Sequence, residues 1–348
     1  MNKPLLILTA LSAALSGSTA LACATCGCSL STDAAAGYSS TAGWRISLEY
    51  DDINQNQLRL GNSVISRASV AAVNDAGGSQ EVENGTHNRY LTLGLSYAPS
   101  ADWGFKLQVP YIDRSHSTYG ASTNPLTADN LSSVSIQSLG DVKLLASYQG
   151  WLPTHNLGLQ VGLKLPSGNY GGPNADGTGT VGRNPAAFSA GPNAQLASPA
   201  NLVDTSLQAG TGSTDLIVGA YYYQPVSQDF DFFVNAQHQF AVAHLSVAGA
   251  DYRPGDASTV SLGLRYEANP DVVPQLQLNI SHKSSDQGAL ADRTDSAGTV
   301  AYLSPGVSVK LNPKIQVFGF VQVPVLAHLQ GYQLFPHWTA SLGLGYGF

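Results

Sequence analysis

Residues 44–51 read Trp-Arg-Ile-Ser-Leu-Glu-Tyr-Asp, and this stretch decides the class of fold. Its apolar and aromatic residues fall on even positions, whereas its charged and small polar residues fall on odd positions. Side chains alternate between the two faces of a β-strand, so one face of this strand is apolar and the other is ionic. Such a strand suits a wall that has lipid on one side and water on the other.

The same alternation recurs along the rest of the chain. It is found in residues 90–97, 105–111, 141–149, 157–165, 215–223, 231–240, 260–267, 275–281, 306–311, 315–323 and 338–348. Together with residues 44–51 this makes about twelve strands, an even number as expected of single-chain outer-membrane barrels. We therefore predict an all-β protein whose fold is a transmembrane, antiparallel, up-and-down β-barrel.

The first residues have the pattern of an export signal, because Met-Asn-Lys-Pro is followed by an apolar stretch and then by Ala20-Leu21-Ala22. We predict a signal peptide at residues 1–22, a periplasmic segment at 23–43 and the barrel at 44–348. No later segment has the roughly eighteen apolar residues that a membrane helix needs. Charged residues make up 11% of the chain, against about 25% in soluble domains. The net charge of −7 offers no basic surface for nucleic acid.

The connections between the predicted strands alternate between short and long along the whole chain. The short ones are residues 99–102, 150–156, 225–229, 269–274 and 312–313, with long polar loops between them. Outer-membrane barrels have short periplasmic turns and longer external loops, so we place both termini in the periplasm of a Gram-negative bacterium. Aromatic residues gather beside the short turns, as in an interfacial girdle. A secreted β-sandwich, the competing fold, has no reason to show either feature.

Three stretches carry a resemblance to a known family. They are Ser-Leu-Gly-Asp-Val-Lys-Leu at residues 138–144, Gly-Leu-Lys-Leu-Pro-Ser-Gly at 162–168 and Leu-Gln-Ala-Gly-Thr-Gly-Ser-Thr-Asp at 207–215. The chain resembles the family labelled putative MetA-pathway of phenol degradation, a set of outer-membrane, transporter-like proteins. The resemblance implies a barrel and a transport channel, and it implies no catalytic residues.

The alternation also predicts which polar side chains face the lumen. They are Arg45, Glu49, Lys106, Gln108, Arg114, Lys143, Gln160, Lys164, Asp231, Asn235, Gln237, Arg265, Glu267 and Lys310. Charges of both signs in a narrow barrel leave two interpretations open: a polar pathway for small solutes, or an ion-paired lumen that stabilises the wall and partly plugs it. The longest loop, residues 167–213, would form a constriction if folded inward and a mobile lid if folded outward.

All three cysteines, Cys23, Cys26 and Cys28, lie in the predicted mature amino terminus. The periplasm oxidises exposed thiols, so a disulfide between two of them is one interpretation. Binding of a soft metal such as Cu(I) or Zn(II) is a second, and thiol exchange with a redox partner is a third. Apart from such a metal, we predict no cofactor.

The sequence favours a passive outer-membrane channel or porin-like transporter for a small solute, in contact with outer-membrane lipid. We do not expect an enzyme, because there is no Gly-x-Ser-x-Gly elbow and none of the eight histidines has tight metal-ligand spacing. An outer-membrane phospholipase is therefore a remote alternative. Another alternative is a scaffold that holds a periplasmic redox or metal partner through the cysteine segment.

Overall fold

The fold comes from a computed structural model, which describes residues 42–121 and 125–348. The wall of the barrel consists of β1 (Gly43–Gly61), β3 (Glu83–Ala98), β4 (Trp103–Thr118), β5 (Ser132–Leu139), β6 (Val142–Tyr148), β7 (Leu157–Leu165), β10 (Thr214–Pro225), β11 (Phe230–Ala243), β14 (Ala257–Tyr266), β15 (Val272–Lys283), β16 (Gly298–Asn312) and β17 (Ile315–Gly347). Shorter elements lie in the connections: β2 (Ser63–Val64), α2 (Arg67–Asp75), η1 (Ala128–Asn130), β8 (Tyr170–Pro173), β9 (Thr180–Arg183), η2 (Pro192–Gln195), η3 (Thr205–Leu207), β12 (Leu245–Val247) and β13 (Ala250–Tyr252).

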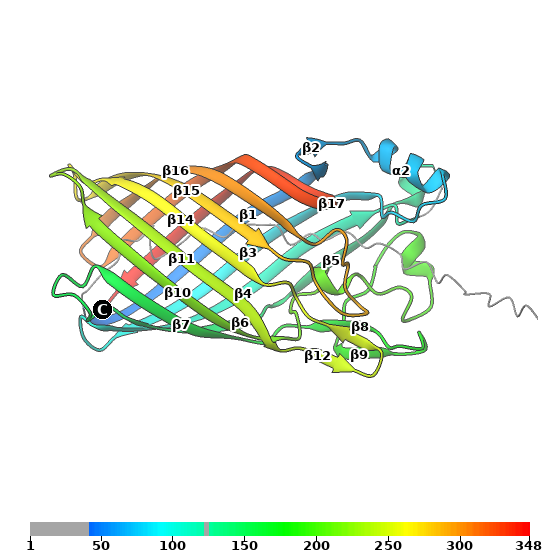
Figure 1. The fold of residues 1–348 in the computed structure, drawn as a ribbon, viewed down its shortest axis with the longest axis horizontal. Coiled ribbons are helices and arrows are strands. Elements are labelled where there is room, and N and C mark those ends of the chain that lie inside the picture. Colours follow the sequence, from blue (N-terminus) through cyan, green and yellow to red (C-terminus); the bar gives the residue numbers. More distant parts are fainter. Residues whose placement is uncertain (1–41, 122–124) are drawn as a thin grey trace, which may run out of the picture.

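The wall strands form one closed antiparallel sheet. Each crossing pairs with the next along the chain, and β17 returns to pair with β1. Tyr50 on β1, for example, lies opposite Leu91 on β3 and Leu342 on β17. Closure pairs the wall strands on both sides, apart from the outer edge of β5, and a sheet in lipid could not tolerate free edges. The predicted up-and-down barrel is therefore confirmed (Figure 1).

β17 contains two crossings joined by a tight turn. Residues 315–329 pair with β16, whereas residues 329–347 pair with β1. The chain reverses at Gly331, whose φ of +69° favours glycine, and the Gly347 amide donates a hydrogen bond to the Lys314 carbonyl at 2.8 Å. A crossing is one passage of the chain along the wall. Among the described residues, β5 and β6 together make one crossing, β17 makes two, and each of the other wall strands makes one. The crossings therefore number twelve, as predicted.

The last connection corrects one part of the sequence analysis. Strict alternation of short and long connections predicts a long loop between residues 323 and 338. In the structure these residues instead extend the two limbs of β17, and only the turn at Gly331 separates them. The outward side chains Val325 and Leu326 are exposed and apolar, so this hairpin continues the wall and needs no polar loop.

β5 and β6 share the same neighbour but differ in what lies on their other edge. Both pair with β4, and β6 then pairs with β7, whereas β5 runs past the end of β7. The Ser133 amide on the other edge of β5 donates to the Ala190 carbonyl at 3.0 Å, and the Ser133 carbonyl accepts from the Ser189 amide at 2.9 Å. The long loop therefore covers the edge that the wall leaves unpaired.

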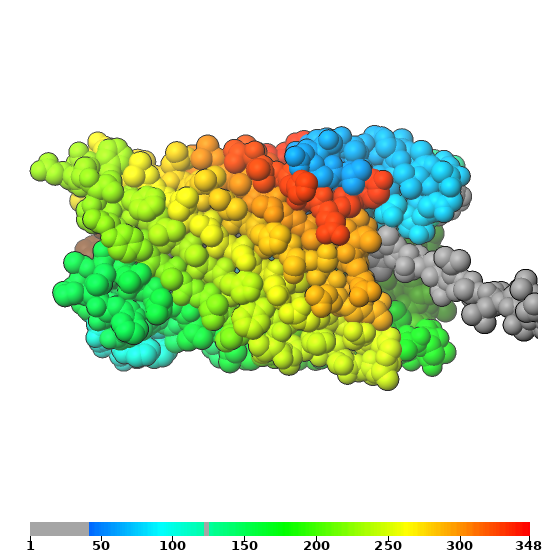
Figure 2. Space-filling model, in the orientation of Figure 1, coloured from blue at the N-terminus to red at the C-terminus, as the bar shows by residue number. Residues whose placement is uncertain are grey.

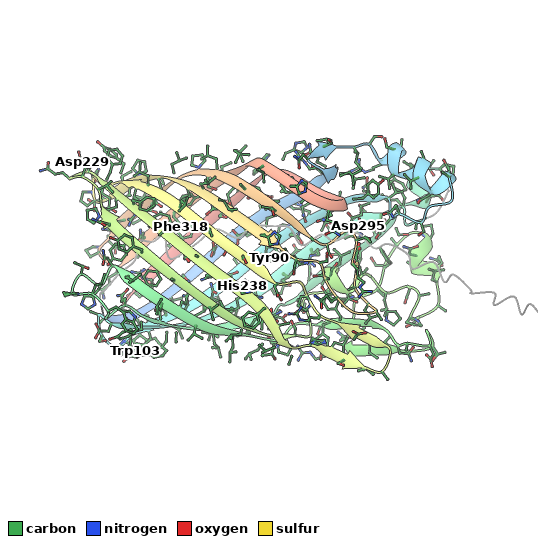
Figure 3. All side chains as sticks on the ribbon, in the orientation of Figure 1. Tyr90, Trp103, Asp229, His238, Asp295 and Phe318 are labelled. Carbon is green, nitrogen blue, oxygen red and sulfur yellow. The ribbon has the colours of Figure 1, made fainter. Side chains whose placement is uncertain are left out.

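Aromatic side chains form a girdle at the end of the barrel that holds the short turns. The ring centroids lie 4.4 Å apart in the pair Trp44–Tyr97, 4.9 Å in Trp103–Tyr148 and 5.0 Å in Phe230–Tyr266. Figure 3 places Trp103 and Asp229 at this end of the molecule and Asp295 at the opposite end. Amphipathic rings at one level of a barrel are typical of a membrane interface.

Towards the other end the outward face becomes polar. On β1, an unbroken row of exposed apolar side chains runs from Trp44 to Tyr50, and the next outward residue, Asp52, lies 3.0 Å from His87 Nε2. On β3 and β4, Arg89 Nη1 lies 3.5 Å from Asp113. Hydrogen-bonding ion pairs would be costly in hydrocarbon, so we place the far edge of the lipid-facing belt at these residues.

The long connections gather at the end remote from the carboxyl terminus. In Figure 1 α2, β8, β9 and β12 lie at this end, and the space-filling view in Figure 2 shows the residues of β2 and α2 in blue covering one side of it. No helix among the described residues is long and apolar enough to cross a membrane.

Candidate functional site: the barrel lumen

The inner face of the wall holds the polar side chains predicted to line the lumen. Cross-strand register links them in rows, as in Arg45–Ser96–Lys106 and Gln108–Lys143–Lys164–Asp215. The predicted residues on this face are Arg45, Glu49, Lys106, Gln108, Arg114, Lys143, Gln160, Lys164, Asp231, Asn235, Gln237, Arg265 and Lys310, with Glu267 directly after β14. Their part in solute passage stays a prediction.

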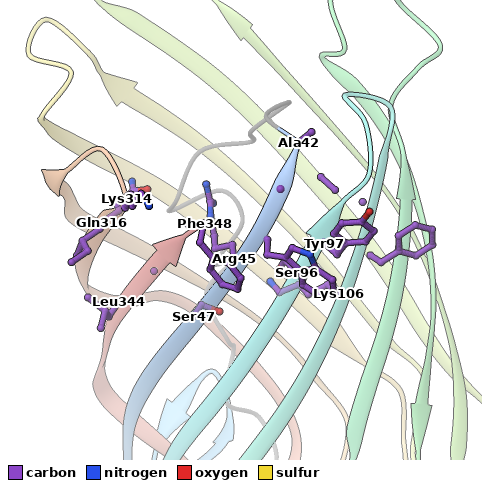
Figure 4. A pocket seen from close by; sticks show the side chains of 18 of the residues that line it. Ala42, Arg45, Ser47, Ser96, Tyr97, Lys106, Lys314, Gln316, Leu344 and Phe348 are labelled. Atoms are coloured by element: carbon purple, nitrogen blue, oxygen red, sulfur yellow. The ribbon is translucent and has the colours of Figure 1, made fainter.

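A cavity of about 500 Å³ occupies the lumen at the end with the short turns. Its charged lining comprises Arg45, Lys106, Lys310, Lys314 and Glu49. Figure 4 shows Arg45, Ser47, Ser96 and Lys106 close together on neighbouring strands, with Lys314 and Gln316 on another side of the cavity. The neutral part of the lining includes Gln149, Gln160, Gln316, Tyr221 and Phe318. We call this cavity the vestibule.

Aromatic rings in the lumen lie flat against glycines of the wall. A Cβ atom added to any of these glycines would overlap the facing ring, so each ring needs the space that a missing side chain leaves. The pairs are Tyr221 on Gly158, Phe233 on Gly263, Phe318 on Gly343 and Phe320 on Gly306. The Tyr221 hydroxyl also donates to Gln149 Oε1 at 2.7 Å. Two of these rings, Tyr221 and Phe318, form part of the vestibule wall.

Deeper in the lumen, buried amides and hydroxyls form a hydrogen-bonded network on β15, β16 and β17. Gln275 Nε2 donates to Ser308 at 2.8 Å, and Asn279 Nδ2 donates to Ser304 at 2.9 Å. Gln277 and Gln322 in the same region are 0% and 1% exposed. Side chains of neutral polar type thus fill this side of the barrel beyond the vestibule.

The three stretches that carry the family resemblance meet at one buried ion-pair cluster. Lys164 Nζ lies 2.9 Å from Asp215 and 3.5 Å from Asp141, and it donates to Ser213 Oγ at 2.9 Å. Asp141 in turn accepts hydrogen bonds from the amides of Gly168 at 3.0 Å and Thr211 at 2.9 Å. Both ends of the long loop are therefore tied to the wall through one lysine and two aspartates.

A second contact holds residues 203–209, near the end of the loop, against the inner face of the barrel. Arg114 on β4 donates to the carbonyl of Leu207 at 2.6 Å, to Asn88 Oδ1 at 2.5 Å and to the Tyr90 hydroxyl at 3.0 Å. Beside it, buried apolar side chains of the loop pack on those of the wall: Ile112, Val134, Ile136, Val203, Leu207 and Ala209. Of the two expected positions of the long loop, residues 203–209 take the inward one, whereas residues 189 and 190 pair with the edge of β5.

Carboxyl groups from separate segments converge where the loop meets β3. Glu83 is 0% exposed, and the backbone of Leu334 is the hydrogen-bonding group that acts on its carboxyl and lowers its pKa. Burial, together with the charges of Glu81, Asp204 and Asp292, raises the pKa of Glu83 well above its usual value. Burial also raises the pKa of Asp204 to about 7. These acids lie beyond the lipid-facing belt, and each holds its proton to a higher pH than an exposed carboxyl does.

The sequence analysis missed several of these groups. Asp141 comes directly before a strand and Asp215 lies at the start of one. The dipeptides Gly-Asp and Thr-Asp at these points were the sequence features that could have identified them. No pattern in the neighbouring sequence identifies Glu83, because its raised pKa depends on segments about 120 and 210 residues away. Among the described residues no three His, Cys, Asp or Glu side chains could hold a metal ion. Cys23, Cys26 and Cys28 lie outside the described residues, so their role stays a prediction.

Comparison with known proteins supports the same fold. The family described as "Putative MetA-pathway of phenol degradation" matches residues 182–325, which confirms the predicted resemblance over this part of the chain. The chain is similar to the crystal structure of the COG4313 outer membrane channel from Pseudomonas putida F1, with a TM-score of 0.58 and 14% identity over 88% of this chain and 96% of that one. At such identity the likeness shows a common barrel fold.

Two further structures are less similar. The translocator domain of autotransporter NalP from Neisseria meningitidis has a TM-score of 0.48 and 9% identity, covering 91% of this chain and 92% of that one. The toluene transporter TbuX from Ralstonia pickettii has a TM-score of 0.42 and 11% identity, covering 88% and 90%. No curated protein matches the chain in sequence.

Proposed function

Since this chain is a closed β-barrel whose residues 182–325 match the family described as "Putative MetA-pathway of phenol degradation", we propose that it is a passive outer-membrane channel for a small solute. The observation that carries the proposal is the vestibule: a cavity of about 500 Å³, with charged and amide side chains in its lining, inside a lipid-facing wall. A cavity of this size fits a small molecule. The similar structure from Pseudomonas putida F1 is itself an outer membrane channel.

The proposal includes an orientation. The end with short turns, the aromatic girdle and the carboxyl terminus faces the periplasm, as is usual for outer-membrane barrels. The amino-terminal cysteine segment would then lie on the periplasmic side as well. The loop cluster with the inward-folded residues 203–209 faces the exterior, so a solute entering from outside meets this loop before it reaches the vestibule.

The inward loop makes the described state a narrowed or closed one. Its anchors are Arg114 and the Lys164 cluster, and both bind it by several hydrogen bonds. A passive channel must let solute pass this point, so we propose that the loop between its anchors sets the conductance. Loops that fold into a barrel act in this way as constrictions.

Planar-bilayer recording of the purified protein tests this function. We expect small, discrete conductance steps from the unaltered barrel, and a several-fold larger conductance when residues 172–206 are replaced by a short Gly-Ser linker. The replacement leaves both anchors in place, and the heat-dependent gel mobility of the variant checks that the barrel has folded. A folded barrel that stays electrically silent without the loop would contradict the channel function.

A further inference from the structure

A row of histidines and hydroxyl groups crosses the outer face of the barrel, away from the lumen. The register of the sheet joins five residues, each opposite the next: His238 on β11, Ser258 on β14, His282 on β15, Thr299 on β16 and His328 on β17. We propose that this histidine row is a docking surface for the phosphate-bearing headgroup of an anionic membrane lipid. The inference goes beyond the proposed channel function, because it concerns the lipid side of the wall, but it rests on the same placement of the barrel in a membrane.

The side chains of the histidine row point outwards. On β11, His238 is an even number of residues from Phe230 of the aromatic girdle, and on β15, His282 is an even number of residues from the exposed Leu276. Residues at such spacing share one face of a strand. His282 and His328 are exposed, and His238 is half-buried. All three rings are therefore accessible from the membrane side.

The row lies where the outer face changes from apolar to polar. One step closer to the short turns, the outward residues on the same five strands are all apolar, and the register joins them in a row of their own: Ala236, Val260, Ile280, Ala301 and Leu326. Lipid tails cover such an apolar row, and the polar headgroups follow at the next level. The molecules that lie against the histidines in a membrane are therefore lipid headgroups.

Each histidine is oriented by a hydrogen bond to a neutral side chain. The bonded pairs are His238 Nδ1 with Ser258 Oγ at 2.9 Å, His282 Nδ1 with Thr299 Oγ1 at 2.8 Å and His328 Nδ1 with Asn62 Oδ1 at 2.7 Å. In these three rings no hydrogen bond joins the second nitrogen, Nε2, to another of the described residues. A protonated Nε2 is a donor, and a phosphate oxygen is the strong acceptor that suits it.

The opposite side of the barrel has its charges paired at the corresponding step. There the register alternates the signs of Asp52 on β1, Arg89 on β3 and Asp113 on β4. Arg89 Nη1 lies 3.5 Å from Asp113, and His87 Nε2 lies 3.0 Å from Asp52. That side offers an anionic headgroup as many acids as cations, so the histidine row is the better surface for it.

The surroundings of the histidine row leave its positive charge uncancelled. Two positions further along each strand, towards the long loops, stand Phe240, Asp256, Ser284, Ala297 and Gln330. Asp256 is the acid among them, and Arg253 Nη2 lies 2.8 Å from its Oδ1. On the remaining sides, β10 places Val218 opposite His238, and the turn after β1 places Asn62 at His328. Histidine gains its positive charge between about pH 8 and pH 5, so we expect the row to attract an anionic headgroup more strongly as the pH falls.

Spin-label electron paramagnetic resonance measures this attraction directly. The full barrel is reconstituted in phosphatidylcholine vesicles, and spin-labelled phosphatidylglycerol is compared with spin-labelled phosphatidylcholine by the fraction of label that the wall immobilises. We expect a several-fold preference for phosphatidylglycerol near pH 5 that declines towards about pH 8. The phosphodiester of phosphatidylglycerol stays charged over this range, so the change in preference reports on the protein.

Substitutions assign the preference to the row. His238→Gln/His282→Gln/His328→Gln should remove the pH-dependent part of the preference, whereas the corresponding triple change to lysine should keep the preference at both pH values. His155→Gln is the matched control, because this histidine lies 3.2 Å from Asp102 in a short turn at the other end of the barrel. Heat-dependent gel mobility shows whether each variant has folded.

A pH-dependent preference that survives the triple change to glutamine would overturn the inference, and so would a preference in the unaltered barrel that does not vary with pH. Inorganic phosphate, added at constant ionic strength, should leave the preference intact, because the acyl chains hold the lipid against the wall. A preference that it abolishes would assign the row to free phosphate instead of lipid. None of these measurements depends on conduction, so an electrically silent barrel that keeps the preference would remove the channel proposal alone.

Discussion

At the scale of single residues, small and large side chains are matched across neighbouring strands of the lumen. Gly263 lies opposite Phe233 in the register, and the ring occupies the space above the glycine. The alternation of side chains along each strand assigns both residues to the inner face, but it does not show that the ring packs over the glycine. The pairing lets the ring occupy the space that the missing side chain leaves.

We expect Gly263→Ala to destabilise the barrel by about 1–3 kcal/mol, the usual cost of overpacking a closely packed site. The added methyl group would overlap the Phe233 ring and push it into the lumen. Urea unfolding of the protein in lipid vesicles measures the change. Phe233→Leu in the same chain should restore part of the stability, and no coupling between the two substitutions would contradict the close packing.

The contribution of Lys164 to stability is electrostatic, because this side chain is buried between two carboxylates. Removing one member of a buried, hydrogen-bonded ion cluster leaves unpaired charge, which costs about 3–5 kcal/mol. We therefore expect Lys164→Met to lower the free energy of unfolding in vesicles and to expose the long loop to protease. Lys314→Met, on the exposed rim of the vestibule, is the control. Equal effects of the two changes would argue against the anchor.

At the scale of elements, the final hairpin closes the barrel. Residues 315–329 extend the sheet from β16, and residues 329–347 bring it back to β1. The closure therefore depends on a turn short enough to keep both limbs in the wall. Gly331 supplies this turn with a φ of +69°, and it lies directly against Asp295 of the preceding loop.

We expect Gly331→Ala to impair folding, because the new methyl group would overlap Asp295 Oδ1 in backbone that already disfavours a side chain. Gly61→Ala is a matched control: its φ is +59°, and no atom lies within 4 Å of the added group. The fraction of heat-modifiable, folded barrel on a gel compares them. The prediction fails if the two variants fold equally well.

At the scale of the whole molecule, the two ends of the lumen carry opposite chemistry. The vestibule has an excess of cations, whereas buried acids gather where the long loop meets β3. Burial raises the pKa of Asp204 from 3.8 to about 7 and that of Asp295 to about 6. The groups that face Glu83 are Glu81, Asp204 and Asp292, and Arg67 binds its backbone carbonyl at 3.1 Å.

This cluster predicts a pH-dependent constriction. Because Asp204 belongs to the long loop and its pKa is raised by burial in the docked position, docking holds a proton that the released loop loses. The stability of docking is complete below the ordinary carboxyl pKa, and it declines as the pH rises through about 7. We expect the conductance to increase between about pH 5 and pH 8. In Glu83→Gln/Asp204→Asn, which imitates the protonated pair, the conductance should stay low throughout. A conductance that falls with rising pH would contradict the prediction.

Much of this architecture follows from local chemistry alone. Period-two alternation, as in residues 44–51, fixes which side chains meet lipid, because a strand has only two faces and hydrocarbon excludes ionic groups. The same rule identifies Arg45, Lys106 and Lys310 as inward residues, and turn length with aromatic clustering separates the two ends of the barrel. These features were readable because each depends on neighbours within a few positions along the chain.

Other features appeared only when the sheet had closed. Asp141, Lys164 and Asp215 meet because β6, β7 and β10 lie side by side. Arg45 and Lys106 come to lie on one row because β1, β3 and β4 are neighbours in the closed sheet. The sequence by itself determined the barrel fold and the sign of the charge on each side chain that faces the lumen. The tertiary structure decided which charges cancel and that the end of the long loop folds inward, because both depend on contacts between residues far apart in the chain.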